Sequence, residues 1–224
     1  NLFYLLKYSK FFLNYNKTCI ESKKISLNFD KIWRDEIKKD KNLKKNWRQK
    51  TNEQDAFNNH WKNYYDFSSI ISILNFLSKS KKSIIDIGSY DGFFLQFYKN
   101  FSKIFLSDIM SDASIKGYDF IKLNGKNLDK IESNLVDVIF SIDTLVRLEK
   151  SVLKNYFENF SRILKPQGIL FCHIPNLLSA ESYKKRMTMV NDNFFFEILK
   201  NDFNEIYFDD NLTKIGKFVI AIKT

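Results

Sequence analysis

The sequence predicts an α/β fold: a mostly parallel, Rossmann-like sheet with helices on both faces, preceded by an N-terminal helical extension. The first observation is a β-branched run at 83–87 that ends in an acid-glycine turn and is followed by a new apolar run. The second is that further apolar runs, at 103–108, 119–124, 135–141 and 169–174, alternate with segments of helical character. Strands interleaved with helices are typical of a parallel sheet buried on both faces.

The composition is that of a globular protein with one main core. The chain has 224 residues, of which 44% are hydrophobic and 23 are Phe. We expect residues 1–63 to form the extension and residues 64–224 to form the α/β domain. Cys19 and Cys172 match no metal or redox spacing, and with only two histidines a structural zinc site is not expected. A reduced, cytoplasmic setting is therefore the expectation.

The extension begins with an apolar and aromatic stretch, residues 1–16, that lysines interrupt well before the ~20 residues of a membrane span. No small-residue cleavage site follows, so we expect neither a transmembrane segment nor a signal peptide. Three roles fit this stretch: a helix docked on the domain, a contact in a homodimer, or an anchor at a membrane surface. Residues 27–50 then place large apolar side chains at roughly helical spacing with lysines between them, as on a solvated helix face.

The net charge of +10 is concentrated in this extension. Residues 1–60 carry 14 Lys and Arg against 7 Asp and Glu, whereas the rest of the chain carries 22 against 19. A basic arm of this kind can bind nucleic acid. Only 5 of the 36 basic residues are Arg, however, and the abundance of Lys, Asn, Ile and Phe is what an A/T-rich genome produces without selection for binding. Nucleic acid is therefore an alternative partner that the composition does not favour.

A helix opens the α/β domain, because its apolar residues repeat at i, i+3 and i+4. These residues are Phe67, Ile70, Ile71, Leu74 and Leu77. The aromatic residues just before it, Trp61, Tyr64 and Tyr65, either pack or cover a ligand. A Lys- and Ser-rich segment at 78–82 ends the helix before the first strand.

The loop after the first strand places Asp86 two residues before Gly88, and Gly92 follows four residues later. Gly88 can adopt a positive φ or let a ligand approach the bare backbone. Gly92 lets the next helix pack close to the strand and present free N–H groups at its start. Neither the dinucleotide pattern G-x-G-x-x-G nor the phosphate loop G-x-x-x-x-G-K-[ST] is present. A carboxylate beside this loop favours a cationic ligand, with an ordinary strand-to-helix turn as the alternative.

The second strand ends in Asp108, 22 residues beyond Asp86. An acid at the end of a second strand can accept both hydroxyls of a ribose. The clearest helix spans 151–164, with Ser151 as its expected N-cap, and it must end before Pro166. The pattern then predicts a short helix at 194–200.

Two further strands complete the pattern. One lies around 206–208, and the last spans 217–222.

Five stretches, in this order along the chain, resemble motifs of class I S-adenosylmethionine (SAM)-dependent methyltransferases of the small-molecule type. They are Asp86-x-Gly88-x-x-x-Gly92, the third-strand segment 120–128, the fourth-strand segment 136–145, the R-x-L-K-P-x-G turn at 162–168, and Pro175-Asn176. The resemblance covers residues 64–224. It implies seven strands with a reversed last hairpin, and SAM as cofactor across the carboxyl ends of the first two. Tyr90 and Gln167 stand where many members have Gly, and Arg147 stands where many have His.

The resemblance also implies which residues hold the cofactor. They are Asp86 at its amino end, Gly88, Ser89 and Gly92 around its methionine part, Asp108 at the ribose, Ile109 and Asn124 at the adenine, and Ser141 at the floor of the site.

Methyl transfer requires an aligned nucleophile and, for a hydroxyl, a proton acceptor. Asp143 is the first candidate base, because it follows the fourth strand at the edge where the motifs meet. His173 is the second, although the alternation of its strand favours a packed core histidine. Lys184, Lys185 and Arg186 follow the fifth strand, where the family often builds a lid over its substrate. A cationic lid suits an anionic acceptor, with a solvated charge run as the alternative.

The sequence therefore predicts methyl transfer to a small-molecule acceptor, with a sugar or sugar-phosphate hydroxyl as the leading candidate. One alternative is an RNA methyltransferase that uses the basic extension. Another is a catalytically silent methyltransferase fold that serves as an interaction protein. Arg147 and the aromatic extension motivate the silent alternative, whereas the retained acids and glycines oppose it.

Overall fold

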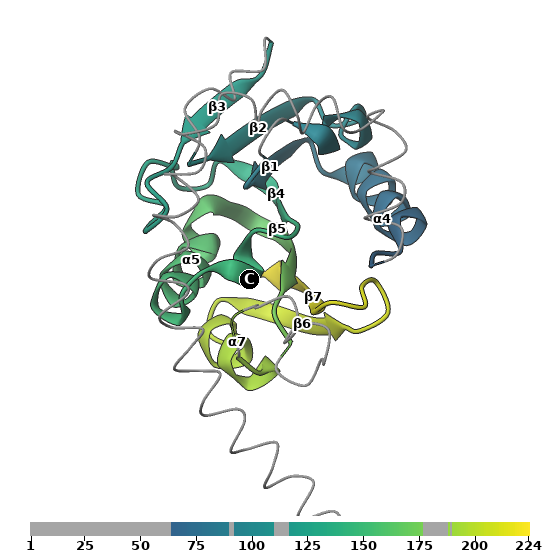
Figure 1. Ribbon diagram of the computed structural model, residues 1–224. Helices are drawn as coiled ribbons and strands as arrows, with labels where there is room; N and C mark the ends of the chain where they lie inside the picture. Colours follow the sequence, from purple (N-terminus) through teal and green to yellow (C-terminus); the bar gives the residue numbers. More distant parts are fainter. Residues whose placement is uncertain (1–63, 90–91, 110–116, 177–187, 189) are drawn as a thin grey trace, which may run out of the picture. The chain divides into compact units, whose positions relative to one another are not determined.

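A computed structural model of the chain describes residues 64–89, 92–109, 117–176, 188 and 190–224 (Figure 1). The described strands are β1 (Ser83–Ile87), β2 (Lys103–Asp108), β3 (Asp119–Lys122), β4 (Val136–Ser141), β5 (Leu164–Ile174), β6 (Phe203–Asp209) and β7 (Lys217–Lys223). The described helices are α4 (Phe67–Ser80), α5 (Lys150–Ile163) and α7 (Asp192–Leu199), with the 3-10 helices η1 (Phe93–Phe97) and η2 (Leu145–Arg147). What the sequence predicts for residues 1–63 lies outside the described residues.

The described strands form one seven-stranded sheet with the order β3-β2-β1-β4-β5-β7-β6. From β3 to β5 all neighbouring strands are parallel. Strand β7 enters between β5 and β6 and runs antiparallel to both. The sheet with a reversed last hairpin that the sequence predicts is therefore confirmed. No helix among the described residues is both long and apolar enough to span a bilayer.

Helices cover both faces of the sheet, as Figure 1 shows. Because successive side chains of a strand point to opposite faces, β1 contributes to two separate cores. Ile85 and Ile87 pack with residues of α5 and α7 on one face. Ile84 packs with residues of α4 and η1 on the other, where many of the buried side chains are aromatic. Packing on both faces thus holds the strands in place at the edge of the sheet where the predicted site residues lie.

Two helix predictions need correction. Ser151 is not the N-cap of α5: Glu149 occupies that position, because its carbonyl already accepts a hydrogen bond from Leu153 N at 2.8 Å. The segment after Gly92 forms the 3-10 helix η1 rather than an α-helix, with Tyr98 N bonded to Leu95 O at 3.0 Å. The 3-10 helix ends at Phe97. The side chain of the next residue, Tyr98, is fully buried.

Strand β5 also begins earlier than the sequence predicts, at residue 164 rather than 169. Pro166 lies inside it, and the pairing of β4 with β5 shifts register between Val136 and Val138. Gln167 adopts a φ of +59°, a left-handed conformation that favours glycine. A Gly would adopt this conformation more readily, which agrees with the Gly that the motif resembled by residues 162–168 often carries at the position of Gln167.

A partly buried polar contact holds the amino ends of β1 and β4 together. Asp137 Oδ2 accepts hydrogen bonds from Ser83 N at 2.8 Å, Ser83 Oγ at 2.6 Å and Lys82 N at 3.1 Å. The Lys165 ammonium lies 3.3 Å from the same oxygen. One carboxylate oxygen therefore links the start of β1 to the start of β4.

We expect Asp137→Ala to lower the free energy of unfolding by about 2–3 kcal/mol, because it leaves Ser83 N and Lys82 N without their acceptor. Urea unfolding at neutral pH measures this loss. Asp119→Ala, an exposed acid at the start of β3, is the matched control and should cost less than about 0.5 kcal/mol. Equal losses for both variants would contradict the prediction.

Candidate functional site

The predicted site residues meet at the carboxyl edge of the sheet. Strands β1, β2, β4 and β5 are parallel, so their carboxyl ends lie together. The order of the strands reverses between β1 and β4, which is where open α/β sheets bind ligands. Residues from these four strand ends therefore surround one region.

The loop after β1 is fastened to the end of β2. Gly88 N and Ser89 N both donate to Ser107 O, at 2.7 and 3.0 Å. Gly88 has a φ of +82°, and a Cβ placed on it would lie 2.1 Å from Thr144 Oγ1. Gly92 has a φ of +77° at the N-cap of η1. Gly88 is thus required both by its conformation and by the close approach of Thr144.

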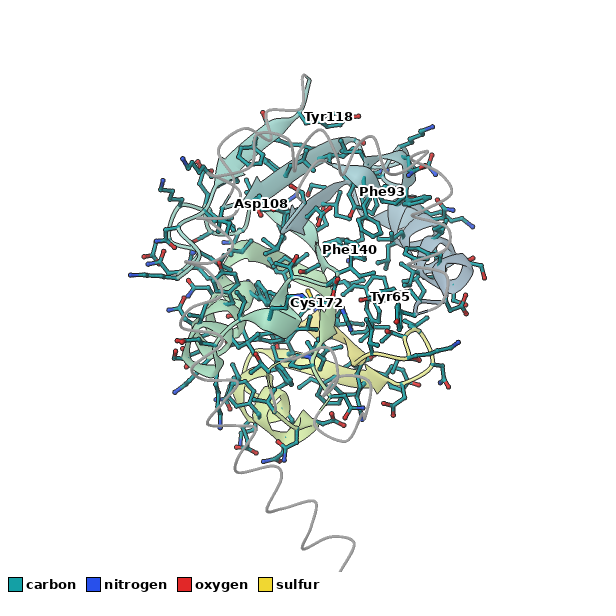
Figure 2. All side chains as sticks on the ribbon, in the orientation of Figure 1. Tyr65, Phe93, Asp108, Tyr118, Phe140 and Cys172 are labelled. Carbon is teal, nitrogen blue, oxygen red and sulfur yellow. The ribbon has the colours of Figure 1, made fainter. Side chains whose placement is uncertain are left out.

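Asp86 is turned into the protein rather than toward solvent. Its side chain is nearly fully buried, and its Oδ2 accepts a hydrogen bond from the Tyr98 hydroxyl at 2.9 Å. Burial raises the pKa of Asp86 to about 7; the Tyr98 hydrogen bond opposes this, and the nearby charge of Asp108 adds to it. Phe140, which Figure 2 labels, packs against Tyr98 with ring centroids 5.9 Å apart. Direct contact of Asp86 with a cofactor therefore stays a prediction.

The ribose candidate, Asp108, ends β2 and is 8% exposed (Figure 2). Its carbonyl accepts a hydrogen bond from Leu123 N at 2.8 Å, so the chain after β3 passes beside it. Ile109 follows Asp108 and packs against the core on the α5 side of the sheet. Asn124 lies two residues after the end of β3. Its Oδ1 accepts a hydrogen bond from the backbone N–H of Lys126 at 2.8 Å in a tight turn. All three predicted nucleoside contacts thus lie at neighbouring strand ends.

Ser141 has a structural partner at the floor of this region. Its hydroxyl donates to Ile87 O at 2.8 Å and joins the end of β4 to the end of β1. Ser89 is likewise buried, with its hydroxyl 3.4 Å from Ser107 O. Both serines therefore hold the strand ends in place.

The first candidate base, Asp143, follows β4 with a φ of +55°. Its Oδ1 lies 3.5 Å from Arg147 Nη2, and its backbone N–H donates to His173 Nδ1 at 3.2 Å. Asp143 keeps a partly exposed side chain, 19% accessible, at the carboxyl edge. Its role as the base stays a prediction.

The second candidate base, His173, is completely buried. Its Nε2 lies 2.6 Å from Ile215 O, and its Nδ1 lies 3.2 Å from the hydroxyl of Tyr65. Burial lowers the pKa of His173 to about 3; the Ile215 hydrogen bond opposes this, and the charge of Arg147 adds to it. The ring is thus neutral near pH 7 with both nitrogens engaged, an arrangement that supports a packed histidine rather than a base.

The sequence marks Tyr65 as an aromatic residue that packs or covers a ligand and Arg147 as a replacement for His, but it does not reveal that both lie close to Asp143. Tyr65 lies 108 positions before His173, so no local pattern links them. The cationic run 184–186 lies outside the described residues. Within the described part of the chain, no group of three or more His, Cys, Asp or Glu side chains is arranged to hold a metal ion.

Replacing Asp86 by Asn should make stability less dependent on pH. Because the folded pKa of about 7 lies above the usual value of 3.8, the contribution of Asp86 is fully present below about pH 4 and is lost as the pH rises to about 7. At pH 8 the wild type carries a buried charge that costs roughly 2–4 kcal/mol, whereas Asn stays neutral and still accepts from Tyr98. Urea unfolding between pH 4 and pH 8 should show the variant gaining relative stability with pH. Parallel curves would contradict this.

Gly88→Ala should destabilise the fold more than Gly117→Ala. Both glycines have a positive φ, but a Cβ on Gly117 would meet nothing within 4 Å. We expect about 1–2 kcal/mol for Gly117→Ala from backbone strain alone. The collision with Thr144 should add roughly 1–3 kcal/mol for Gly88→Ala. Thermal unfolding of the two variants measures the difference, and equal losses would show that Thr144 moves aside freely.

Solved structures with the same fold are distant in sequence. They include the PH0226 protein from Pyrococcus horikoshii OT3, at 17% identity and a TM-score of 0.55 over 75% of this chain and 99% of that one. CalS10, a SAM-bound amino pentose methyltransferase from Micromonospora echinaspora, shares 10% identity with a TM-score of 0.58 over 70% of this chain and 89% of its own. The N-methyltransferase NodS from Bradyrhizobium japonicum WM9, bound to S-adenosylhomocysteine, shares 16% with a TM-score of 0.53 over 70% and 86%. At these identities the likeness shows the fold.

Family assignment comes from the sequence itself. A comparison with curated proteins finds no match. A family model described as "Methyltransferase domain" matches residues 61–204, which is more than half of the chain. The match includes the acid-glycine loop, both acids and the segment after β4, and it confirms the resemblance drawn from the motifs. The chain belongs to the methyltransferase domain family.

Proposed function

We propose that this chain is a SAM-dependent methyltransferase that acts on a small-molecule acceptor. The observation that carries the proposal is the meeting of the loop at Gly88 with the acids Asp86 and Asp108 at adjacent strand ends of a methyltransferase domain. Two carboxylates beside one another favour a ligand with positive charge. The division into an extension, residues 1–63, and a methyltransferase domain, residues 64–224, is part of this proposal, and the family match from residue 61 supports it.

The residues present fit SAM. Asp108 stands beside the loop where its carboxylate would accept the ribose hydroxyls, and Ile109 offers an apolar surface to the adenine. Asn124 would read the adenine edge. Gly88 and Ser89 would shape the loop around the methionine part. SAM supplies a methyl group that its sulfonium already activates.

The chain's own task is then to orient the acceptor and receive its proton. Proximity and orientation can supply about 7–11 kcal/mol of the barrier. Asp143 is our candidate for the base, because its partly exposed carboxylate follows β4 at the same edge as Asp86 and Asp108. Arg147, within 3.5 Å of Asp143, would favour the ionised carboxylate.

For the acceptor we propose a sugar or sugar-phosphate hydroxyl. The amino pentose methyltransferase CalS10 has the same fold and acts on a sugar, which supports a small, polar acceptor by analogy. The guanidinium of Arg147 at the carboxyl edge suits a phosphate or carboxylate on that acceptor.

Thermal unfolding with S-adenosylhomocysteine tests the cofactor. Ligand at 100 times its dissociation constant should add about 2.7 kcal/mol, which is a shift on the order of 5–10 °C for a chain of this size. Asp108→Ala should lose most of the shift, because it removes the ribose acceptor. Asp119→Ala is the matched control and should keep the wild-type shift. This exposed acid lies at the amino end of β3, whereas Asp108 pairs with the carboxyl end of β3. No shift of the wild type at millimolar ligand would favour the silent-fold alternative instead.

A further inference from the structure

The least explained group at the carboxyl edge is the buried imidazole of His173, which the proposed chemistry does not use. The ring is enclosed on several sides. It stacks on Phe218 with centroids 5.4 Å apart and meets the edge of Tyr65 at 5.2 Å. A Cβ on Gly216 would lie 2.5 Å from Nε2, so the backbone passes directly over that atom. The ring therefore has one fixed position.

Its hydrogen-bond partners define its tautomer. A carbonyl oxygen can only accept, so Nε2, 2.6 Å from Ile215 O, carries the proton. Nδ1 is then an acceptor, and two neighbouring groups can donate a hydrogen bond to it. The backbone N–H of Asp143 and the hydroxyl of Tyr65 both lie 3.2 Å from it.

Tyr65 remains a donor throughout the neutral range. Burial raises the pKa of Tyr65 well above its usual value of 10.0, and the charge of Asp143 raises it further, although Arg147 opposes this. The Tyr65 hydroxyl carries one proton, however, and it also hydrogen-bonds to the side chain of Asp143. The backbone N–H of Asp143, two residues after β4, is therefore the donor that faces His173 Nδ1 in either case.

The contact with Asp143 matters because of the conformation of that residue. Asp143 has a φ of +55°. This left-handed conformation raises the free energy of an L-residue, so contacts with the surrounding structure must stabilise it. The Asp143 carboxylate lies 3.5 Å from the Arg147 guanidinium. Because backbone conformation restricts side-chain rotamers, holding the N–H of Asp143 narrows the directions in which its carboxylate can point.

We propose that His173 is a positioning residue: it holds the left-handed backbone of Asp143 through Nδ1 and thereby aims the Asp143 carboxylate at the acceptor. The inference rests on the proposed function, because it assigns Asp143 the role of base. Strand β5, which carries His173, would then position the base in addition to packing at this edge. Neutral His173 acts without gaining or losing a proton.

Nuclear magnetic resonance of ¹⁵N-histidine protein tests the tautomer in the intact chain. We expect His173 to keep the Nε2–H tautomer, with no titration between pH 5 and pH 9. The amide of Asp143 should exchange slowly in the wild type. An Nδ1–H tautomer, or titration near pH 6.5, would overturn the proposal because Nδ1 could not then accept.

Variants test the consequence for methyl transfer, followed with methyl-labelled SAM and a protein-free small-molecule extract as the source of acceptor. His173→Phe keeps an aromatic ring, although a larger six-membered one, and removes the acceptor, and we expect about a 10²-fold loss of maximal rate. His173→Asn restores an acceptor near Nδ1 and should recover most of that rate. S-adenosylhomocysteine affinity should change less than about twofold in both variants, because His173 acts through Asp143 alone. Phe171→Leu, equally buried in β5, controls for lost packing and should keep the rate.

A double-mutant cycle separates positioning from packing. If His173 acts through Asp143, the rate loss caused by His173→Phe should shrink to less than about threefold in an Asp143→Asn background. An equal loss in both backgrounds, in an enzyme that binds S-adenosylhomocysteine and transfers methyl groups, would overturn this inference alone. A wild type that binds no S-adenosylhomocysteine and transfers no label would instead overturn the proposed function, and this inference with it.

Discussion

The carbonyl oxygen of Ser107 is the point on which the candidate site depends. It accepts hydrogen bonds from the backbone of Gly88 and Ser89, while the Ser107 hydroxyl donates to Asp86 O at 3.0 Å. The end of β2 and the loop after β1 therefore hold each other. Because Asp108 is the next residue, these contacts also fix the distance between the two acids. The fully buried position of Ser107 keeps water from competing for these hydrogen bonds.

A second layer of contacts controls charge at this edge. Asp86 is buried, which raises its pKa, and Asp143 lies beside Arg147. Two carboxylates at one edge of a sheet thus have different surroundings, one apolar and one ionic. Under the proposed function, this contrast favours Asp143 over Asp86 as the base.

The strands and the acid-glycine loop were predictable from the sequence, because apolar runs and glycine spacing are local signals. The reversed last hairpin came from the family resemblance rather than from periodicity. The start of β5 was missed because Pro166 usually ends regular structure, and the 3-10 winding of η1 was missed because both helix types place apolar residues similarly. The site around His173 was beyond the sequence, since its partners Tyr65 and Ile215 lie 108 and 42 residues away.

The antiparallel entry of β7 has a consequence for biosynthesis. Ile215, Gly216 and Phe218, which enclose the His173 ring, belong to β7 and the turn before it. They leave the ribosome only after all of β1 to β6 has been made. A nascent chain can therefore assemble the cofactor loop early while the edge around His173 stays wet and unformed. The surroundings of His173 would then form in a single late step, when β7 inserts between β5 and β6.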